Sequence, residues 1–423
     1  MVDQTAPGLR GSGGRIFYGW WIIGAAIVGL SSAPSQFAFG ALGLFIVPLG
    51  EEYGWDRAEI SLALTFFTGC LAVCLPFAGR LADRIGSRRM LVPTIVICGL
   101  LLAAIPLVVS QLWHLLLIFG LIGAVGAGAN TLPYMLTISA WFDRRRGLAM
   151  GLAMAGGGLS FAYVPPLVQF LIDNYGWRSG YFVLSAIAVL FAAPVVGLIF
   201  RDSPDEKGLQ PDGDPEPPPG RPSIASTGMS LSASLRRREF WLLWTVFCLL
   251  SFSLYGLLPH IVPMLTDRGM QPGTAALASS TVGVTIIVAR VVIGYLIDRI
   301  FAPRVAVVFF LLTAMGIGVL AGGATGPLAF VAAVLIGLSM GAELDLLAFL
   351  TSRYFGLRHF GAVFGVMFAA LLVGTSAGPV SYGAAYELNG SYVKILILSA
   401  ALTALSAMIM LLLRPYPDFS RTV

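Results

Sequence analysis

The sequence predicts an all-α membrane protein with twelve transmembrane helices in two pseudo-symmetric six-helix bundles. Of its 423 residues, 57% are hydrophobic and 11% are charged, and the mean hydropathy is +0.86. Soluble chains carry roughly 25% charged residues. Apolar runs of about 20 residues or more, long enough to cross a bilayer, recur along the chain. Motifs of the first half also return in the second half at a nearly constant offset.

The predicted spans divide six and six. The N-terminal bundle, residues 17–200, contains spans at 17–49, 58–79, 90–110, 113–140, 147–172 and 178–200. The C-terminal bundle, residues 239–413, contains spans at 239–265, 274–297, 303–323, 327–352, 359–385 and 392–413. The first span is long, and Pro34 and Pro48 within it predict a bent or extended helix.

The segment between the bundles, residues 201–238, differs in composition from the rest of the chain. It contains DSPDEKGLQPDGDPEPPPGRP, a run rich in proline and charge that cannot bury a core. We therefore expect a mobile cytoplasmic linker there. Residues 1–16 and 414–423 are expected to be short cytoplasmic tails.

The basic residues predict the orientation of the spans. With the N-terminus in the cytoplasm, 21 of the 26 Lys and Arg residues fall on the cytoplasmic side, and only four fall outside. This is a strong positive-inside bias. The remaining basic residue, Arg290, lies in the middle of a predicted span. We expect a multi-pass protein of the cytoplasmic (inner) membrane with both termini in the cytoplasm.

An internal repeat relates the two halves. GRLADR, Gly79–Arg84, returns as GYLIDR, Gly294–Arg299, at an offset of 215 residues. The glycine pair Gly147 and Gly151 returns as Gly361 and Gly365. We expect Gly147, Gly151, Gly156, Gly157 and Gly158 to let helices approach closely, because small residues allow such contacts in membranes. Transporters are often built from such repeats, with the substrate site near mid-membrane at the interface of the repeats.

Arg290, in GVTIIVARVVIGYLI, is the main candidate for a substrate-binding residue. A charge at mid-span costs about 2.5–3.5 kcal/mol on insertion scales, so it should face a cavity or a partner. One interpretation is an anchor for a substrate carboxylate, which fits the planar guanidinium fork. The other is an ion pair with Glu343 or Asp345, the two acids well inside a predicted span.

The two acids are also candidates for proton coupling, because an acid that Arg290 releases to a substrate would take up a proton. They stand two residues apart, about 200° around a helix, so they cannot both line one cavity face. We expect Asp345 to be the one that faces the cavity. His260 is a third candidate proton carrier, although a histidine between prolines is as often a hydrogen-bond donor in helix packing.

Two other polar residues are predicted to bind substrate. Asn130 and Tyr134 stand four residues apart in the fourth span and share one helix face. We expect the Tyr134 hydroxyl to donate a hydrogen bond to the substrate.

The loop GRLADRIGSRR, Gly79–Arg89, resembles the signature loop of the major facilitator superfamily. WFDRRRGLAMGLAMAGGG, Trp141–Gly158, resembles the fifth-helix entry of its monocarboxylate-porter and oxalate/formate-antiporter branch. The resemblance covers essentially the whole chain and implies the major facilitator fold, with Arg290 at the position of the family's carboxylate anchor. Two departures stand out: the eleventh span carries no lysine or arginine, and Ile286 stands where animal monocarboxylate porters carry an aspartate.

The signature loop also suggests a conformational latch at the cytoplasmic end of the bundles. A carboxylate there can accept charge-assisted bonds from arginines and from a helix N-terminus. The alternative is a simple topology anchor. The latch candidates are Asp83, Arg84, Arg88 and Arg89, and Asp298 and Arg299 of the repeat.

The sequence therefore predicts a transporter of a small organic anion, a monocarboxylate above all, driven by alternating access and coupled to protons. The alternatives are efflux of drug-like or cationic compounds, anion exchange without proton coupling, or a transporter-like sensor. No phosphate-binding loop, nucleophile elbow or metal cluster is present, so we expect no enzyme activity, cofactor or metal. The expected partners are the substrate, a proton and the bilayer, with no nucleic acid, and the protein is expected to be a monomer.

Overall fold

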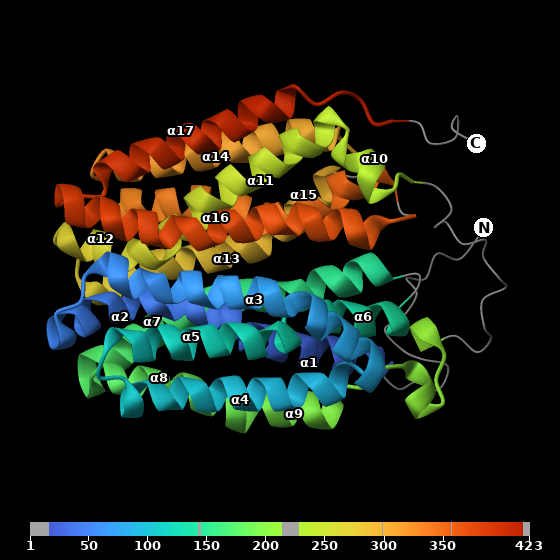
Figure 1. The fold of residues 1–423 in the computed structure, drawn as a ribbon, viewed down its shortest axis with the longest axis horizontal. Helices are drawn as coiled ribbons and strands as arrows, with labels where there is room; N and C mark the ends of the chain where they lie inside the picture. Colours follow the sequence, from blue (N-terminus) through green and yellow to red (C-terminus); the bar gives the residue numbers. More distant parts are fainter. Residues whose placement is uncertain (1–16, 143–144, 214–227, 298, 357, 418–423) are drawn as a thin grey trace, which may run out of the picture.

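The computed structural model describes residues 17–142, 145–213, 228–297, 299–356 and 358–417, apart from the side chains of Asp83 and Arg146. Within these ranges twelve helices are long and apolar enough to cross a membrane, as the sequence predicts. Figure 1 shows them as two bundles that lie side by side, α1 to α9 in one and α11 to α17 in the other.

The N-terminal bundle contains the first six spans. They are α1 (Gly19–Ser31) with α2 (Pro34–Tyr53), α3 (Arg57–Ile85), α4 (Ser87–Val108), α5 (Leu112–Gly126) with η1 (Ala127–Ala129) and α6 (Thr131–Trp141), α7 (Arg146–Tyr175), and α8 (Trp177–Ala186) with the π-helical η2 (Ile187–Ala192) and α9 (Ala193–Ile199). The predicted bend of the first span is present: α1 ends at Ser31 and Pro34 begins α2, where its missing N–H costs no helical hydrogen bond.

The C-terminal bundle contains the other six spans. They are α11 (Arg238–Leu257) with η6 (Leu258–His260) and α12 (Ile261–Asp267), α13 (Pro272–Ile297), α14 (Ala302–Ala321), α15 (Pro327–Phe355), α16 (Phe360–Asn389) and α17 (Val393–Leu411). The fourth and seventh spans are each interrupted by a 3-10 turn, at η1 and η6.

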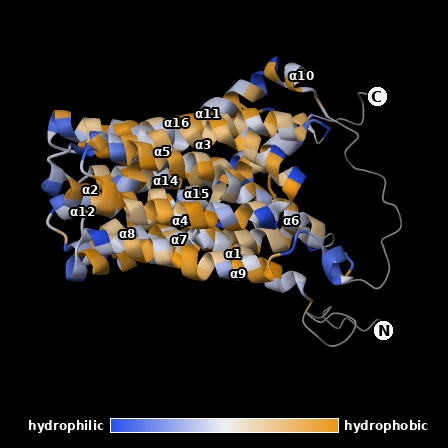
Figure 2. Ribbon diagram, turned by 60° about the horizontal axis from the view of Figure 1, so that its bottom comes forward, coloured by the Kyte–Doolittle hydropathy of each residue, from blue (hydrophilic) through white to orange (hydrophobic). Residues whose placement is uncertain are grey.

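The two ends of the bundles are hydrophilic and the middle is apolar, as Figure 2 shows. We call the end that carries the short helix α10 (Leu231–Leu235) the linker end. The far end is the opposite one, where α12 and the connection between α2 and α3 lie (Figure 1).

The described parts of the linker are more structured than the sequence suggests. Residues 201–213 contain two short 3-10 helices, η3 (Pro204–Lys207) and η4 (Pro211–Gly213), and residues 228–237 contain α10. The Trp141 indole donates to the Arg201 carbonyl at 2.9 Å, and the Met229 amide donates to the Phe355 carbonyl at 2.8 Å. Each described part of the linker is therefore held against one bundle by a hydrogen bond to the linker's own backbone. Amino-acid composition does not reveal a contact of this type.

The bundles pack closely at mid-span and toward the far end, where glycines allow backbone contact. A Cβ on Gly283 of α13 would lie 2.2 Å from the Ala162 backbone nitrogen of α7, and one on Gly43 of α2 would lie 2.1 Å from the Pro259 carbonyl oxygen. These distances are far below van der Waals contact, so any side chain there would push the bundles apart.

The linker end is different. Gly147 and Gly151 of α7 and their repeat partners Gly361 and Gly365 of α16 have no described atom within 4 Å of where a Cβ would stand. These four positions at the starts of α7 and α16 are exposed and make no such contact. The expectation of close helix packing is therefore wrong for Gly147 and Gly151 in this conformation. It is confirmed further along α7, where a Cβ on Gly156 would lie 2.6 Å from the Ile27 carbonyl oxygen and one on Gly158 would lie 2.7 Å from Ile287 Cγ1.

Gly123 gives a test of packing inside the N-terminal bundle. Its Cβ would meet the Phe67 carbonyl oxygen at 2.1 Å, and a backbone atom cannot rotate away. Gly123→Ala should lower the free energy of unfolding by about 1–3 kcal/mol through overpacking. Thermal unfolding of the purified protein in detergent measures this. Gly24→Ala is the control, because Gly24 is exposed and no described atom lies near its Cβ position. Equal stability of the two variants would contradict the packing.

Candidate functional site

A small cavity lies between the two bundles at mid-span. Its volume is about 60 Å³, enough for a molecule of a few non-hydrogen atoms. The lining residues are Leu30, Gln36, Thr131, Met154, Gly157, Gly158 and Phe161 from the N-terminal bundle and Tyr255, Ile286, Arg290, Met340 and Leu344 from the C-terminal bundle. A ligand in this cavity would therefore touch both halves.

Most of the wall is apolar, with a few polar groups at defined points. The polar side chains are Gln36 of α2, Thr131 of α6, Tyr255 of α11 and Arg290 of α13, and Arg290 is the one charged residue among the lining residues. The Ser35 hydroxyl donates to the Gln36 amide oxygen at 2.7 Å, which orients that amide. An apolar wall with few convergent polar groups is typical of a small-molecule site.

Arg290 reaches the cavity because it stands one helical turn after Ile286, so both project from the same face of α13. Its side chain is only 9% exposed, and its Nη1 donates to Asp345 Oδ1 at 3.1 Å. Its Nε is buried and has no partner among the described residues. The ion pair therefore uses one end of the guanidinium fork and leaves a donor available for a second oxyanion.

The two acids of α15 (Pro327–Phe355) lie in different surroundings, because they stand on different faces of the helix. The Asp345 side chain is 34% exposed and contacts Arg290. It is not one of the residues that line the cavity, so the expectation that it faces the cavity is not met directly. Glu343 is fully buried inside the C-terminal bundle, where the Ser251 hydroxyl of α11 donates to its Oε1. Its Oε2 has no partner among the described residues. A buried carboxylate without a countercharge is strongly disfavoured, so this site suits a neutral acid.

The structure does not bring Tyr134 or Asn130 to this cavity. Tyr134 is fully buried, with its ring against Phe200 at 5.6 Å between centroids and its hydroxyl beside Gly29. The Asn130 side chain caps α6 by accepting from the Thr131 amide at 2.6 Å. The cavity is instead lined by Thr131, one residue further along. The expectation that the pair shares one helix face is wrong, because Asn130 is the extended N-cap of α6 and only Tyr134 lies within the helix.

His260 lies apart from the cavity, at the far end of the seventh span. It is fully buried, and both ring nitrogens have hydrogen-bond partners: Nδ1 with the Tyr392 hydroxyl at 3.0 Å, and Nε2 with the Pro379 carbonyl at 2.9 Å. This arrangement corresponds to a packing role as readily as to a proton carrier.

The latch candidates at the linker end are only partly described. Asp298 and the side chain of Asp83 lie outside the described residues. Arg84 and Arg89 are exposed, and the Arg299 guanidinium contacts the Tyr295 hydroxyl of the preceding helix, α13. Arg88 is better held, since its backbone amide donates to Asp202 at 2.8 Å and its Nε donates to the Gly197 carbonyl at 2.9 Å. These contacts all stay within one bundle.

Sequence reasoning missed Met154 and Met340, which also line the cavity. Met340 and Leu344 stand four residues apart on α15, and Leu344 directly precedes Asp345. The sequence signal for these cavity residues was their place on α15 close to Asp345. Apolar residues on that face were not distinguishable by sequence from those that face lipid.

A two-bundle helical protein with a ligand-sized cavity between its halves has the architecture of a membrane carrier. The family model described as the Major Facilitator Superfamily matches residues 28–379 and 261–422. The chain belongs to the Major Facilitator Superfamily. It is a membrane transporter of the monocarboxylate-porter-like group and not an enzyme.

Curated relatives cover most of the chain. Monocarboxylate transporter 11 of Homo sapiens is 29% identical over 91% of this chain and 81% of the relative. The same transporter of Mus musculus is 30% identical over 88% of this chain and 83% of the relative. Monocarboxylate transporter 4 of Rattus norvegicus is 25% identical over 97% of this chain and 86% of the relative.

A solved structure supports the fold alone. It is a bacterial homolog of the human lysosomal transporter Spinster in an inward-facing, unoccupied conformation. The TM-score is 0.67 at 17% identity, over 95% of this chain and 99% of that chain.

The Arg290–Asp345 pair can be tested by a double-mutant cycle. Asp345→Asn leaves a buried guanidinium without its countercharge, so we expect a loss of about 1.5–3 kcal/mol in the free energy of unfolding. Arg290→Gln should cost a similar amount, and the double variant should cost clearly less than the sum. Denaturant unfolding in detergent micelles measures all four proteins. Additive losses would contradict an energetic coupling of the two side chains.

Proposed function

We propose that this protein is a secondary active transporter that moves a small organic anion, a monocarboxylate, by alternating access and in a proton-coupled manner. The observation that carries the proposal is the buried cation Arg290 in a largely apolar cavity between the two bundles. The names of the curated relatives, all monocarboxylate transporters, support the same substrate class.

Arg290 suits a carboxylate better than other ligands. A guanidinium stays charged at all physiological pH values and can donate two parallel hydrogen bonds to one carboxylate. Its unpartnered Nε and the apolar wall formed by residues such as Met154, Phe161 and Met340 match a ligand with one anionic end and an apolar body. A single cation in the lining favours one carboxylate over two.

Asp345 supplies a route to proton coupling. In this conformation it neutralises Arg290. When a substrate carboxylate takes its place, an ionised Asp345 would leave the site with an excess negative charge close to the membrane centre. Uptake of one proton by Asp345 restores neutrality, so that one anion and one proton bind together.

Glu343 is the alternative proton site. Its burial and its Ser251 partner suit a neutral carboxyl that stays protonated through the cycle and stabilises the C-terminal bundle. We therefore assign coupling to Asp345 and packing to Glu343. Tyr134, Asn130 and His260 lie outside the cavity in this conformation, and a direct contact with substrate would require a different one.

The linker end is assigned to the cytoplasm on the distribution of basic residues. Its described arginines include Arg80, Arg84, Arg88, Arg236 and Arg353, whereas the far end carries four basic residues, Arg57, Arg178, Arg268 and Lys394. The protein would then lie in the cytoplasmic membrane with its linker inside the cell. Efflux of cationic drugs is disfavoured, because Arg290 would repel a cation at the cavity wall.

Ligand-induced thermal stabilisation tests the substrate class. The purified protein is heated with small monocarboxylates, dicarboxylates, amino acids or cationic drugs, each in excess. A ligand at 100 times its dissociation constant adds about 2.7 kcal/mol to the stability of the folded state. We expect monocarboxylates to raise the melting temperature of the wild type and to have no effect on Arg290→Gln. Stabilisation by cations, or by monocarboxylates in both proteins, would overturn the assignment.

Transport at varied pH tests the division of labour between the acids. In proteoliposomes, Asp345→Asn should abolish proton-driven uptake while exchange of internal for external substrate continues, because a neutral residue at 345 can no longer gain or lose a proton. Glu343→Gln should keep the wild-type pH profile, since it imitates a carboxyl that stays protonated. If Glu343→Gln alone loses the pH dependence, the two roles are reversed. If neither does, the carrier is an exchanger without proton coupling.

A further inference from the structure

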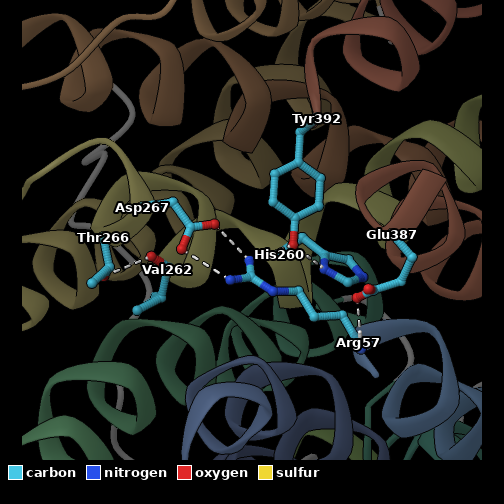
Figure 3. Close-up of polar contacts among 7 residues, drawn as sticks. All are labelled: Arg57, His260, Val262, Thr266, Asp267, Glu387 and Tyr392. Carbon is cyan, nitrogen blue, oxygen red and sulfur yellow. Dashed lines mark hydrogen bonds and ion pairs between the residues drawn. The ribbon is translucent and has the colours of Figure 1, made fainter. Parts of the chain in front are cut away.

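Arg57, the first residue of α3 in the N-terminal bundle, bonds to three residues of the other bundle at the far end (Figure 3). Its Nη1 and Nη2 donate to the two carboxylate oxygens of Asp267 at 2.7 and 2.9 Å. Its Nη1 also donates to the Tyr392 hydroxyl at 2.9 Å, and its backbone amide donates to the Glu387 carboxylate at 3.1 Å. The Arg57 side chain is only 14% exposed.

The network continues from Tyr392 to His260, as Figure 3 shows. A carbonyl can only accept, so the His260 Nε2 carries the proton and donates it to Pro379. Nδ1 is then an acceptor, and the Tyr392 hydroxyl donates to it while accepting from Arg57. Burial raises the pKa of Tyr392, which keeps this hydroxyl protonated and able to donate. The Ser61 hydroxyl, also from α3, lies 3.2 Å from Nε2.

The members of this network come from both bundles. Arg57 and Ser61 belong to α3, whereas Asp267, His260, Glu387 and Tyr392 belong to or adjoin α12, η6, α16 and α17. The backbones are also in contact there, since a Cβ on Gly383 of α16 would lie 2.6 Å from the Ala58 Cα. Opening of the far end requires α3 to move away from α12 and α16. It would therefore break these bonds together.

We infer that Arg57 is a positioning residue for transport: the Arg57 network holds the far end closed, and its strength sets the balance between the two access states. A single residue can have this effect because its guanidinium lies between Asp267 and Tyr392 and bonds to both, as Figure 3 shows. The inference depends on the relative movement of the bundles and not on the identity of the substrate. It therefore holds or fails independently of the monocarboxylate assignment.

The chain contains a matched control at the same end. Arg178 of α8 pairs with Glu52 of α2, with Nη2 to Oε1 at 2.5 Å and Nη1 to Oε2 at 3.0 Å. This is also a two-point arginine–carboxylate pair at the far end, but both partners belong to the N-terminal bundle. Opening of the far end leaves it intact. Loss of Arg178 should therefore affect local stability without shifting the access equilibrium.

Distances between spin labels in the protein without ligand test the inference. In a background with the four native cysteines replaced by alanine, one label pair is placed at Glu51 and Leu388 at the far end, and a second at Arg89 and Arg304 at the linker end. All four positions are exposed and each pair spans both bundles. Arg57→Gln and Tyr392→Phe are compared with Arg178→Gln and with the parent protein, and circular dichroism checks the fold.

We expect Arg57→Gln to raise the ratio of far-end-open to far-end-closed molecules at least about tenfold, with a longer far-end distance and a shorter linker-end distance. Tyr392→Phe, which removes one hydroxyl, should shift the ratio in the same direction by less and serves if Arg57→Gln does not fold. Arg178→Gln should match the parent. Unchanged distances in folded Arg57→Gln and Tyr392→Phe proteins, or an equal shift in Arg178→Gln, would overturn the inference.

Discussion

The burial of one guanidinium at mid-membrane is the constraint on which the rest of the site depends. A charge in that place costs several kcal/mol unless it is neutralised and hydrogen-bonded. Asp345 supplies the countercharge, and the gap between the two bundles supplies the polar space. The acid must stand within reach of the guanidinium, as Asp345 does beside the cavity residue Leu344 of α15, and the cavity lies between the bundles. The same pair then makes the site responsive, because any anion that enters competes with Asp345 for Arg290.

The bundles meet through two kinds of contact. At mid-span and toward the far end, these are close backbone contacts at glycines, as at Gly283 and Gly43. At the far end itself, the contacts are charged and directional, centred on Arg57. A two-point ion pair favours one geometry, whereas a contact at a glycine requires only the absence of a side chain. The charged contacts therefore give the closed far end a defined position, and the glycines allow the two backbones to lie close together.

The sequence was sufficient for the fold because its signals were long and redundant. Twelve apolar runs, the repeat and the signature loop all indicated one architecture, and the structure differs from the predicted spans by only a few residues at most ends. The site was predictable in part. Arg290 stood out because a charge in an apolar run has few explanations. Asn130 and Tyr134 are four residues apart in one apolar run, but the periodicity did not reveal that the helix is interrupted at Asn130.

The Arg57 network was not predictable by the same reasoning, because charges at the ends of spans are common and usually mark the membrane surface. A signal did exist: Gly54 and Gly269 stand 215 residues apart, the offset of the internal repeat, and Arg57 follows Gly54 by three residues while Asp267 precedes Gly269 by two. If the corresponding ends of the two halves meet in space, opposite charges at these positions can form an ion pair between the bundles. That inference needs the pairing of the ends in space, which only the structure supplies.

The open space around Gly147, Gly151, Gly361 and Gly365 has a consequence for how mutations at these positions are read. A methyl group added at any of the four meets no described atom in this conformation, so it carries no steric penalty here. A change in transport caused by such a substitution would therefore indicate a conformation in which other atoms approach these positions. Substitutions at these four positions are therefore probes of other conformations and not of the packing in this one.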